Sequence, residues 1–169
     1  MKRHIVSALV ENRPGTLSRV SGLFSRRGYN IDSVTVGVTE DPSISRMTIV
    51  VSGDEAILEQ IIKQLSKLVD VITVRALAAD SCLCREIMII KLGSGEDKRS
   101  AVREIAETSN ARIIDVSSDT IIIEATGDTD KLDDLLLLLR PFGILELART
   151  GLVALERGPL VLSVSTGIG

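Results

Sequence analysis

Two kinds of hydrophobic spacing alternate along the chain and predict alternating strands and helices. Apolar side chains dominate residues 5–10, as in a buried strand, and predict a strand over about residues 3–10. They then recur at helical spacing over residues 16–27, where Val20, Leu23 and Phe24 share one side. The further elements expected in the first half are strands over 30–38, 45–52 and 70–77 and a helix over 54–67. The order of elements is therefore β-α-β-β-α-β.

The second half repeats this order. The expected elements are strands over 86–92, 111–117, 120–126 and 144–150, and helices over 98–109 and from Asp128 through Leu139. The pairs Gly53-Asp54 and Gly127-Asp128 each end a strand and start a helix in corresponding places. We therefore expect an α+β fold of two tandem βαββαβ units, with helices on one face of each antiparallel sheet. The expected boundaries are 1–78 and 79–158, followed by a tail over 159–169 that is a candidate for disorder.

The most informative segment is the junction between the first strand and the first helix, where Asn12 and Arg13 precede Pro14-Gly15. Gly15 has no side chain, so a ligand can approach the backbone closely there. The amides of Gly15, Thr16 and Leu17 are expected to be free at the helix start, and free amides in that position attract a carboxylate. The other interpretation is a tight turn before a helix, with no ligand.

Amide side chains complete the hypothesis of an amino-acid site. Asn12 and Asn30 are candidates to flank it, because each can offer an oxygen to an ammonium group. Val36 or a residue of a second chain is the candidate for the aliphatic pocket, although a slip in the alternation at Asp32-Ser33 leaves the face of Val36 open. The second half has Gly93-Ser94-Gly95-Glu96 at the corresponding place, which is typical of a flexible turn. We therefore expect a site in the first unit only.

Composition excludes several classes of protein. The net charge is −3 and acids and bases are well mixed, so the basic surface of a nucleic-acid-binding protein is absent. The single histidine lies far in sequence from Cys82 and Cys84, whose spacing fits neither a zinc site nor a CxxC redox motif, and no metal site is expected. The longest apolar run, Leu135–Leu139, is too short to cross a membrane, and no signal peptide is expected at the N-terminus. We expect reduced thiols and a cytoplasmic location.

Several ordered motifs together resemble a known family. They lie at residues 12–20, 23–31, 45–49, 64–71, 85–88 and 111–116. In both halves this sequence is similar to the regulatory small subunit of acetolactate synthase, also called acetohydroxyacid synthase. The resemblance covers residues 3–157 and is specific, because the motifs agree in order across both halves. It does not extend to the tail after Gly158.

The resemblance implies a fold and a function. The first unit is implied to be an ACT domain, a ferredoxin-like amino-acid sensor that pairs with a second copy in a homodimer. The chain is implied to be non-catalytic, to activate a separate catalytic large subunit, and to confer feedback inhibition by a branched-chain amino acid, usually valine. Thiamine diphosphate, magnesium and FAD are implied to belong to that catalytic partner, and no cofactor is expected in this chain. The effector is expected at Asn12, Pro14, Gly15, Thr16, Leu17, Asn30 and Val36.

Three other functions remain to be weighed. An enzyme needs an acid, base or nucleophile in a shaped pocket, and the sequence contains no triad-like or metal-like cluster. An RNA-binding βαββαβ unit stacks bases on aromatic side chains, but Phe24 and Tyr29 are the only aromatic residues of the first half. A stand-alone ACT regulator of another enzyme is the main alternative, and the resemblance of the second half argues against it.

Overall fold

The structure is a computed structural model that describes residues 2–93 and 95–164. The chain divides into two compact units. The first unit contains residues 1–83 together with 152–169, and the second contains residues 84–151. The sequence-based boundaries assigned residues 152–158 to the second unit, whereas in the structure they pack with the first.

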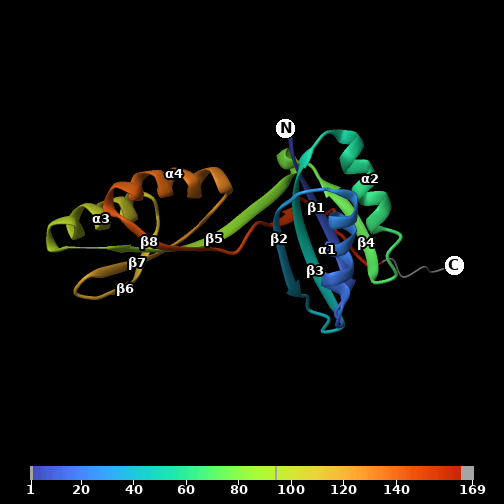
Figure 1. Ribbon diagram of the computed structural model, residues 1–169, viewed down its shortest axis with the longest axis horizontal. Coiled ribbons are helices and arrows are strands. Elements are labelled where there is room, and N and C mark those ends of the chain that lie inside the picture. The colour runs from blue at the N-terminus through green and yellow to red at the C-terminus, as the bar shows by residue number, and fades with distance from the viewer. Residues whose placement is uncertain (1, 94, 165–169) are drawn as a thin grey trace. The chain divides into compact units, whose positions relative to one another are not determined.

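The first unit has the expected βαββαβ order, and its first helix has the expected limits. Its elements are β1 (Lys2–Glu11), α1 (Thr16–Arg27), β2 (Ile31–Val38), β3 (Ile44–Gly53), α2 (Glu55–Leu65) and β4 (Val71–Leu77). The strands form an antiparallel sheet in the order β2-β3-β1-β4, so β2 and β4 are its edges. Both helices pack on one face of this sheet (Figure 1). A short 3-10 helix, η1 (Ala79–Ser81), follows.

The second unit repeats this topology. Its elements are β5 (Cys82–Gly93), α3 (Glu96–Thr108), β6 (Arg112–Val116), β7 (Thr120–Gly127), α4 (Thr129–Leu139), η2 (Arg140–Phe142) and β8 (Ile144–Arg149). The strand order β6-β7-β5-β8 matches that of the first sheet. A final strand, β9 (Val153–Glu156), pairs with β5. The fold class is α+β, with two ferredoxin-like units as expected. Both cysteines lie in β5, which begins before the strand expected over 86–92.

The internal repeat extends to local details. Asp54 caps α2 by accepting a 2.8 Å hydrogen bond from the Ile57 amide, and Asp128 caps α4 by accepting one of 2.9 Å from the Lys131 amide. Each unit also has a register shift in the strand after its first helix, at residues 31–33 in β2 and 113–115 in β6. The shift in β2 lies where the sequence alternation slips. These shared features support the interpretation of one pattern used twice.

Each unit has its own aliphatic core between its helices and the covered face of its sheet. In the first unit the fully buried side chains include Phe24, Ile49, Ile61 and Leu65, and Phe24 is the only aromatic residue among them. In the second unit the core is built from Met88, Ile90, Leu92, Val102, Ile121, Ile123, Leu132 and Leu139. Burial of these side chains is the main favourable contribution to the folding of each unit.

The other face of the first sheet is covered by the end of the chain. We call residues 152–164 the C-terminal strap. Leu152 and Ala154 are buried, the Leu152 amide donates to Ser33 Oγ at 3.2 Å, and Glu156 accepts from Arg75 Nη1 at 2.7 Å. Residues 160–164, expected as part of a tail, line a groove against this face. The rest of that tail, residues 165–169, lies outside the described residues.

A buried carboxylate fixes the turn between β1 and α1. Asp70, at the start of β4, is 1% exposed and accepts hydrogen bonds from Arg13 Nε at 3.0 Å and from Arg19 Nε and Nη2, the latter at 3.0 Å. Its backbone carbonyl also accepts from the Glu11 amide at 2.8 Å. The hydrogen bond from Arg19, followed by that from Arg13, lowers the pKa of Asp70 below its ordinary value against the opposing effect of burial. The two arginines thereby join both sides of the turn to β4.

We expect substitutions on the two sides of α4 to have very different effects on stability. Leu132 is 1% exposed and Leu137 is 57% exposed on the same helix. Leu132→Ala should lower the free energy of unfolding by about 2–5 kcal/mol, because it leaves a cavity, whereas Leu137→Ala should change it by less than about 0.5 kcal/mol. Urea unfolding of both variants tests this expectation, and equal losses would contradict the assigned core.

The Asp70 cluster should make stability depend on acidity. Because the folded-state pKa of Asp70 is depressed, its contribution is fully present above its ordinary value of 3.8 and is lost as the pH falls through the folded value. Asp70→Asn should therefore lower the urea midpoint at pH 7, and the gap to wild type should close in acid. Asp134→Asn, at an exposed position, is the control and should leave the midpoint unchanged at both pH values. A gap that persists unchanged in acid would contradict this role.

Candidate ligand-binding site

The turn before α1 has the backbone geometry that only glycine adopts without strain. Gly15 is the N-cap residue of α1 and has φ of +87°, in the left-handed region. No side chain caps this helix start, and no acidic residue lies in its first turn. The positive end of the helix is therefore left without a negatively charged neighbour from α1 itself.

The free amides expected here are largely present. Within the described residues, the amides of Gly15 and Leu17 have no hydrogen-bond partner, and the Thr16 amide makes only a long contact of 3.4 Å with the Arg13 carbonyl. The Thr16 side chain is buried and donates to the Glu11 carbonyl at 3.1 Å. Thr16 therefore secures the turn through its hydroxyl group, and exposed Pro14 restricts the backbone just before Gly15. The helix start remains open to an anion.

Arg19 adds positive charge at the same place. A Cβ atom built on Gly15 would lie 2.9 Å from Arg19 Nη1, so the guanidinium group lies directly beside Gly15. Arg19 uses Nε and Nη2 to bind Asp70, and this pairing raises the pKa of Arg19. The arginine is thus held in position while Nη1 faces the turn. A carboxylate at the turn would meet both the helix dipole and this charge.

Asn12 lies at the same end of the sheet. Its Nδ2 donates to the Pro42 carbonyl at 2.9 Å, which ties the turn to the loop between β2 and β3. Its amide donates to the Ser43 carbonyl at 2.7 Å. The Asn12 side-chain oxygen has no hydrogen-bond partner among the described residues. It is therefore available to accept from a ligand ammonium group.

Asn30 lies at the opposite end of α1 within the same chain. The helix has 12 residues, which corresponds to about 18 Å at 1.5 Å per residue. Asn30 follows its C-terminal end, where Nδ2 donates to Asp32 Oδ1 at 3.0 Å. The sequence analysis expected Asn12 and Asn30 to flank one site. Within a single chain the two residues lie at opposite ends of α1 and do not meet. The two residues can meet only across two copies of the chain.

The sheet register settles which face Val36 occupies. Val36 pairs with Met47, which is part of the core beneath the helices, so Val36 points to the helix-covered face of the sheet. It lies on edge strand β2 and is 43% exposed. Leu17, in the first turn of α1, is 51% exposed. Both apolar side chains lie toward the end of the sheet that carries the turn and are not covered by their own chain.

The corresponding turn of the second unit is different. Gly95 is the N-cap residue of α3 but has φ of −70° and ψ of 161°, an extended conformation. The left-handed glycine is therefore not repeated there. This difference supports the expectation that only the first unit carries an amino-acid site at this junction.

Sequence reasoning missed the residues that hold the turn in place. Arg13, Arg19 and Asp70 form the ion pairs described above, but none of them was expected in the site. Asp70 is 57 and 51 residues away from its two partners. The only signal in the sequence was an aspartate at the first position of the strand expected over 70–77, where such a residue more often ends a turn.

The described residues contain neither a candidate metal-binding cluster nor a membrane-spanning helix. No group of three or more histidine, cysteine, aspartate or glutamate side chains could hold a metal ion there. No helix in the described part of the chain is both long enough and apolar enough to span a membrane.

Comparisons with known proteins identify the family from both halves. Residues 6–73 match the family described as AHAS small subunit-like ACT domain, and residues 85–158 match that described as small subunit of acetolactate synthase. The second match leaves the alternative of a stand-alone ACT regulator without support.

Individual relatives agree with these matches. The chain is 52% identical over 156 residues to a probable acetolactate synthase small subunit of Methanothermobacter thermautotrophicus, covering 92% of this chain and 93% of the relative. It is 51% identical to the acetolactate synthase small subunit of Mycobacterium leprae, covering 92% of each. The crystal structure of the acetolactate synthase small subunit from Thermotoga maritima superposes with a TM-score of 0.88 at 41% identity, covering 95% of this chain and all of that one. The chain therefore belongs to the family of acetolactate synthase small subunits, and its first unit is the ACT domain of that family.

Proposed function

We propose that the chain is the regulatory subunit that activates the catalytic large subunit of acetolactate synthase and makes it sensitive to inhibition by valine. The observation that carries the proposal is the open helix start at Gly15, with Arg19 beside it, in a chain of this family. The chain itself performs no catalysis in this proposal. Thiamine diphosphate, magnesium and FAD belong to the catalytic partner, and the complex works in the cytoplasm.

The proposed effector is a branched-chain amino acid, with valine first. Its carboxylate meets the amides of Gly15 and Leu17 and the guanidinium of Arg19, because these groups present positive charge to one small volume. Its ammonium group donates to the free side-chain oxygen of Asn12. Its branched side chain packs on exposed Leu17 and Val36, which lack cover in the single chain.

A second copy of the chain completes this site. Strand β2 is an unpaired edge that carries exposed Val34, Val36 and Val38, so it is suited to pairing with another strand. A symmetric dimer through β2 must pair the two strands antiparallel, because the same residues face each other across a two-fold axis. That arrangement brings the start of one β2, where Asn30 lies, beside the end of the other. Asn30 of one copy then supplies a further polar contact to the ligand held by residues 12–17 of its partner.

The proposal predicts a specific pattern of activity. The purified chain alone should form no acetolactate, and it should strongly stimulate its large subunit, with valine reversing that stimulation. Gly15→Asp should abolish inhibition by valine and keep most of the activation, because the added carboxylate occupies the place of the ligand carboxylate. Asn30→Ala should lower the affinity for valine by roughly tenfold or more, since a hydrogen bond to a charged group contributes about 1.5–3 kcal/mol. Acetolactate assays of the reconstituted complex measure all three effects.

The matched control for the glycine variant is Gly143→Asp. Gly143 also has a left-handed backbone, with φ of +84°, but lies in the second unit with open space around its Cβ position. This variant should keep full sensitivity to valine. Unchanged valine inhibition in both Gly15→Asp and Asn30→Ala would place the effector elsewhere, and acetolactate formation by the chain alone would refute the non-catalytic role.

The dimer predicts a separate result in light scattering. The wild-type chain should be a dimer at micromolar concentration, and Val34→Glu should weaken the dimer at least tenfold, because like charges then face each other near the centre of the paired strands. Val153→Glu is the control, since Val153 is similarly exposed on β9. A wild-type monomer, with or without valine, would exclude the proposed two-chain site.

A further inference from the structure

The first unit contains a second candidate site, on the face of its sheet opposite the helices. A groove of about 610 Å³ lies there between β1, β3 and the C-terminal strap. This volume is within the range of about 300–1,000 Å³ that is usual for small-molecule sites. Half of its fourteen lining residues are aliphatic: Leu9, Ile44, Leu155, Leu160, Val161, Leu162 and Val164. These residues all belong to the first unit.

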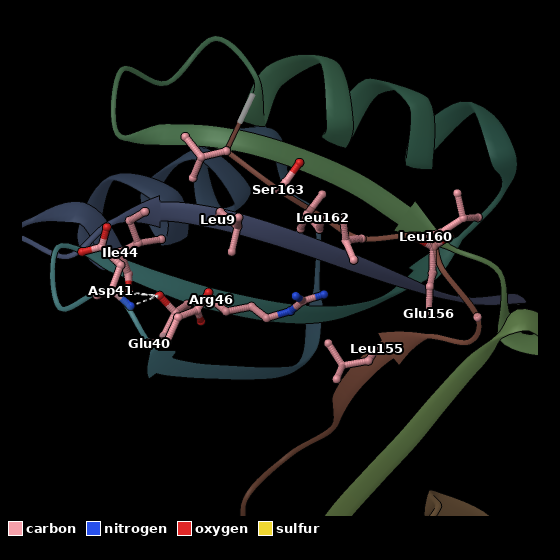
Figure 2. A pocket seen from close by; sticks show the side chains of 14 residues that line it. Leu9, Glu40, Asp41, Ile44, Arg46, Leu155, Glu156, Leu160, Leu162 and Ser163 are labelled. Atoms are coloured by element: carbon pink, nitrogen blue, oxygen red, sulfur yellow. Dashed lines mark hydrogen bonds between the residues drawn. The ribbon is translucent and has the colours of Figure 1, made fainter. Parts of the chain in front are cut away.

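Arg46 brings a positive charge into this aliphatic groove. Figure 2 shows its side chain running along the groove among the leucines of β1, β9 and the rest of the strap. Among the described residues, the buried Arg46 Nε atom has no hydrogen-bond partner, and Nη2 reaches only the Ala154 carbonyl, at 3.5 Å. Burial lowers the pKa of this guanidinium below its ordinary value, which reflects the cost of removing the charge from water. The group stays protonated, so the charge is present without full compensation.

None of the carboxylates at the groove pairs with Arg46 in the described part of the chain. Glu156 lies at the groove, and its charge raises the pKa of Arg46 against the larger effect of burial, but its carboxylate accepts its hydrogen bond from Arg75 Nη1, at 2.7 Å. Asp41 accepts from the Ser43 amide at 2.9 Å and from Ser43 Oγ at 2.7 Å within its own turn. Glu40 is exposed and makes no ion pair with the arginine. A buried guanidinium donor that lacks a carboxylate partner is unusual, because leaving such a group unsatisfied is costly.

We infer that this groove binds a small aliphatic monocarboxylate, with Arg46 as the group that pairs with the carboxylate. The carboxylate satisfies the buried Nε–H of Arg46 and a terminal N–H of the same guanidinium group, which matches the fork geometry of arginine. The aliphatic part of the ligand lies against Leu9, Leu155 and Leu162, where it removes further apolar surface from water. The site is separate from the open helix start at Gly15, because Arg46 and Leu9 lie on the other face of the sheet from Met47 and the helices.

The C-terminal strap contributes one wall of the groove, and part of that wall lies beyond the family match. The match to the small-subunit family ends at residue 158, whereas residues 160–164 line the groove. The strap is held by β9 and by the Arg75–Glu156 ion pair, but Leu160 and Val161 remain more than half exposed. The wall is therefore lightly packed and can adjust to a ligand at small cost.

The test is a titration of the full chain with 4-methylpentanoate, followed through the methyl signals of leucine, isoleucine and valine by nuclear magnetic resonance. We expect saturable shifts at Leu9, Ile44 and Leu162 and no change at Leu17 or Val36. The neutral isostere 4-methylpentanamide should bind at least tenfold more weakly, because it cannot form the charged pair. An absence of shifts at millimolar ligand, shifts confined to Leu17 and Val36, or equal affinity for the amide would overturn the inference.

Variants provide a second, independent measurement by calorimetry. Arg46→Met should lower the affinity for 4-methylpentanoate at least tenfold. Arg46→Lys should retain part of that affinity because the charge remains. The control Arg26→Met should bind the ligand as the wild type does. Unchanged affinity in folded Arg46→Met would overturn the inference. If Arg46→Met does not fold, the comparison of 4-methylpentanoate with 4-methylpentanamide on the wild-type chain still tests the inference. Leucine as a further ligand distinguishes two forms of the site: shifts at Leu9 and Leu162 indicate that an ammonium group is accepted, and their absence indicates a preference for simple acids.

Discussion

Each sheet of this protein is covered by helices on one face only, and this constraint shapes much of the rest of the molecule. A four-stranded sheet with two helices on one side leaves a second face whose alternate residues must be either polar or covered. In the first unit the strand residues of that face include Ile5, Leu9 and Val50, which are too apolar to remain in water, and all three are buried. The chain supplies the cover itself, with β9 and the residues that follow it. The first sheet therefore needs the strap to cover this apolar face.

The same constraint explains why the edge strand β2 stays available. With one face under the helices and the other under the strap, the remaining uncovered apolar surface of the first sheet lies along β2, where Val34, Val36 and Val38 are exposed. An uncovered strand edge of this kind favours pairing with a second copy. A ligand bound where two such edges meet would contact both chains, so ligand binding and dimer stability would be thermodynamically linked. In the proposed complex, a small shift of one copy against the other would be a physical route from the effector to the catalytic subunit.

Periodicity and turn chemistry were sufficient to predict the fold, because those signals are local. The helix over 16–27, the Asp54 and Asp128 caps and the break in alternation at Asp32-Ser33 could all be read from neighbouring residues, and the structure confirms them. The strap could not be predicted in this way. Residues 152–164 contact strands that lie far earlier in the chain: 81 residues separate Arg75 from Glu156, and 108 separate Arg46 from Ala154. Nothing local distinguishes such a segment from a terminal tail.

The candidate site also combines features that neighbouring residues predict with features that depend on tertiary structure. The left-handed Gly15 and the open amides follow from Pro14-Gly15 before a helix, so the sequence located them. The charges around them depend on tertiary structure. Asp70 reaches Arg13 and Arg19 only after β4 has paired with β1, and Arg19 lies beside Gly15 because Asp70 holds its other two nitrogens. If Asp70 were protonated, its charge-assisted hydrogen bonds to Arg19 would weaken and the guanidinium group would no longer be held beside Gly15, even with the backbone unchanged. A ligand bound at Gly15 would therefore depend on the same ion-pair network as folding stability, and acid should weaken both over the same pH range.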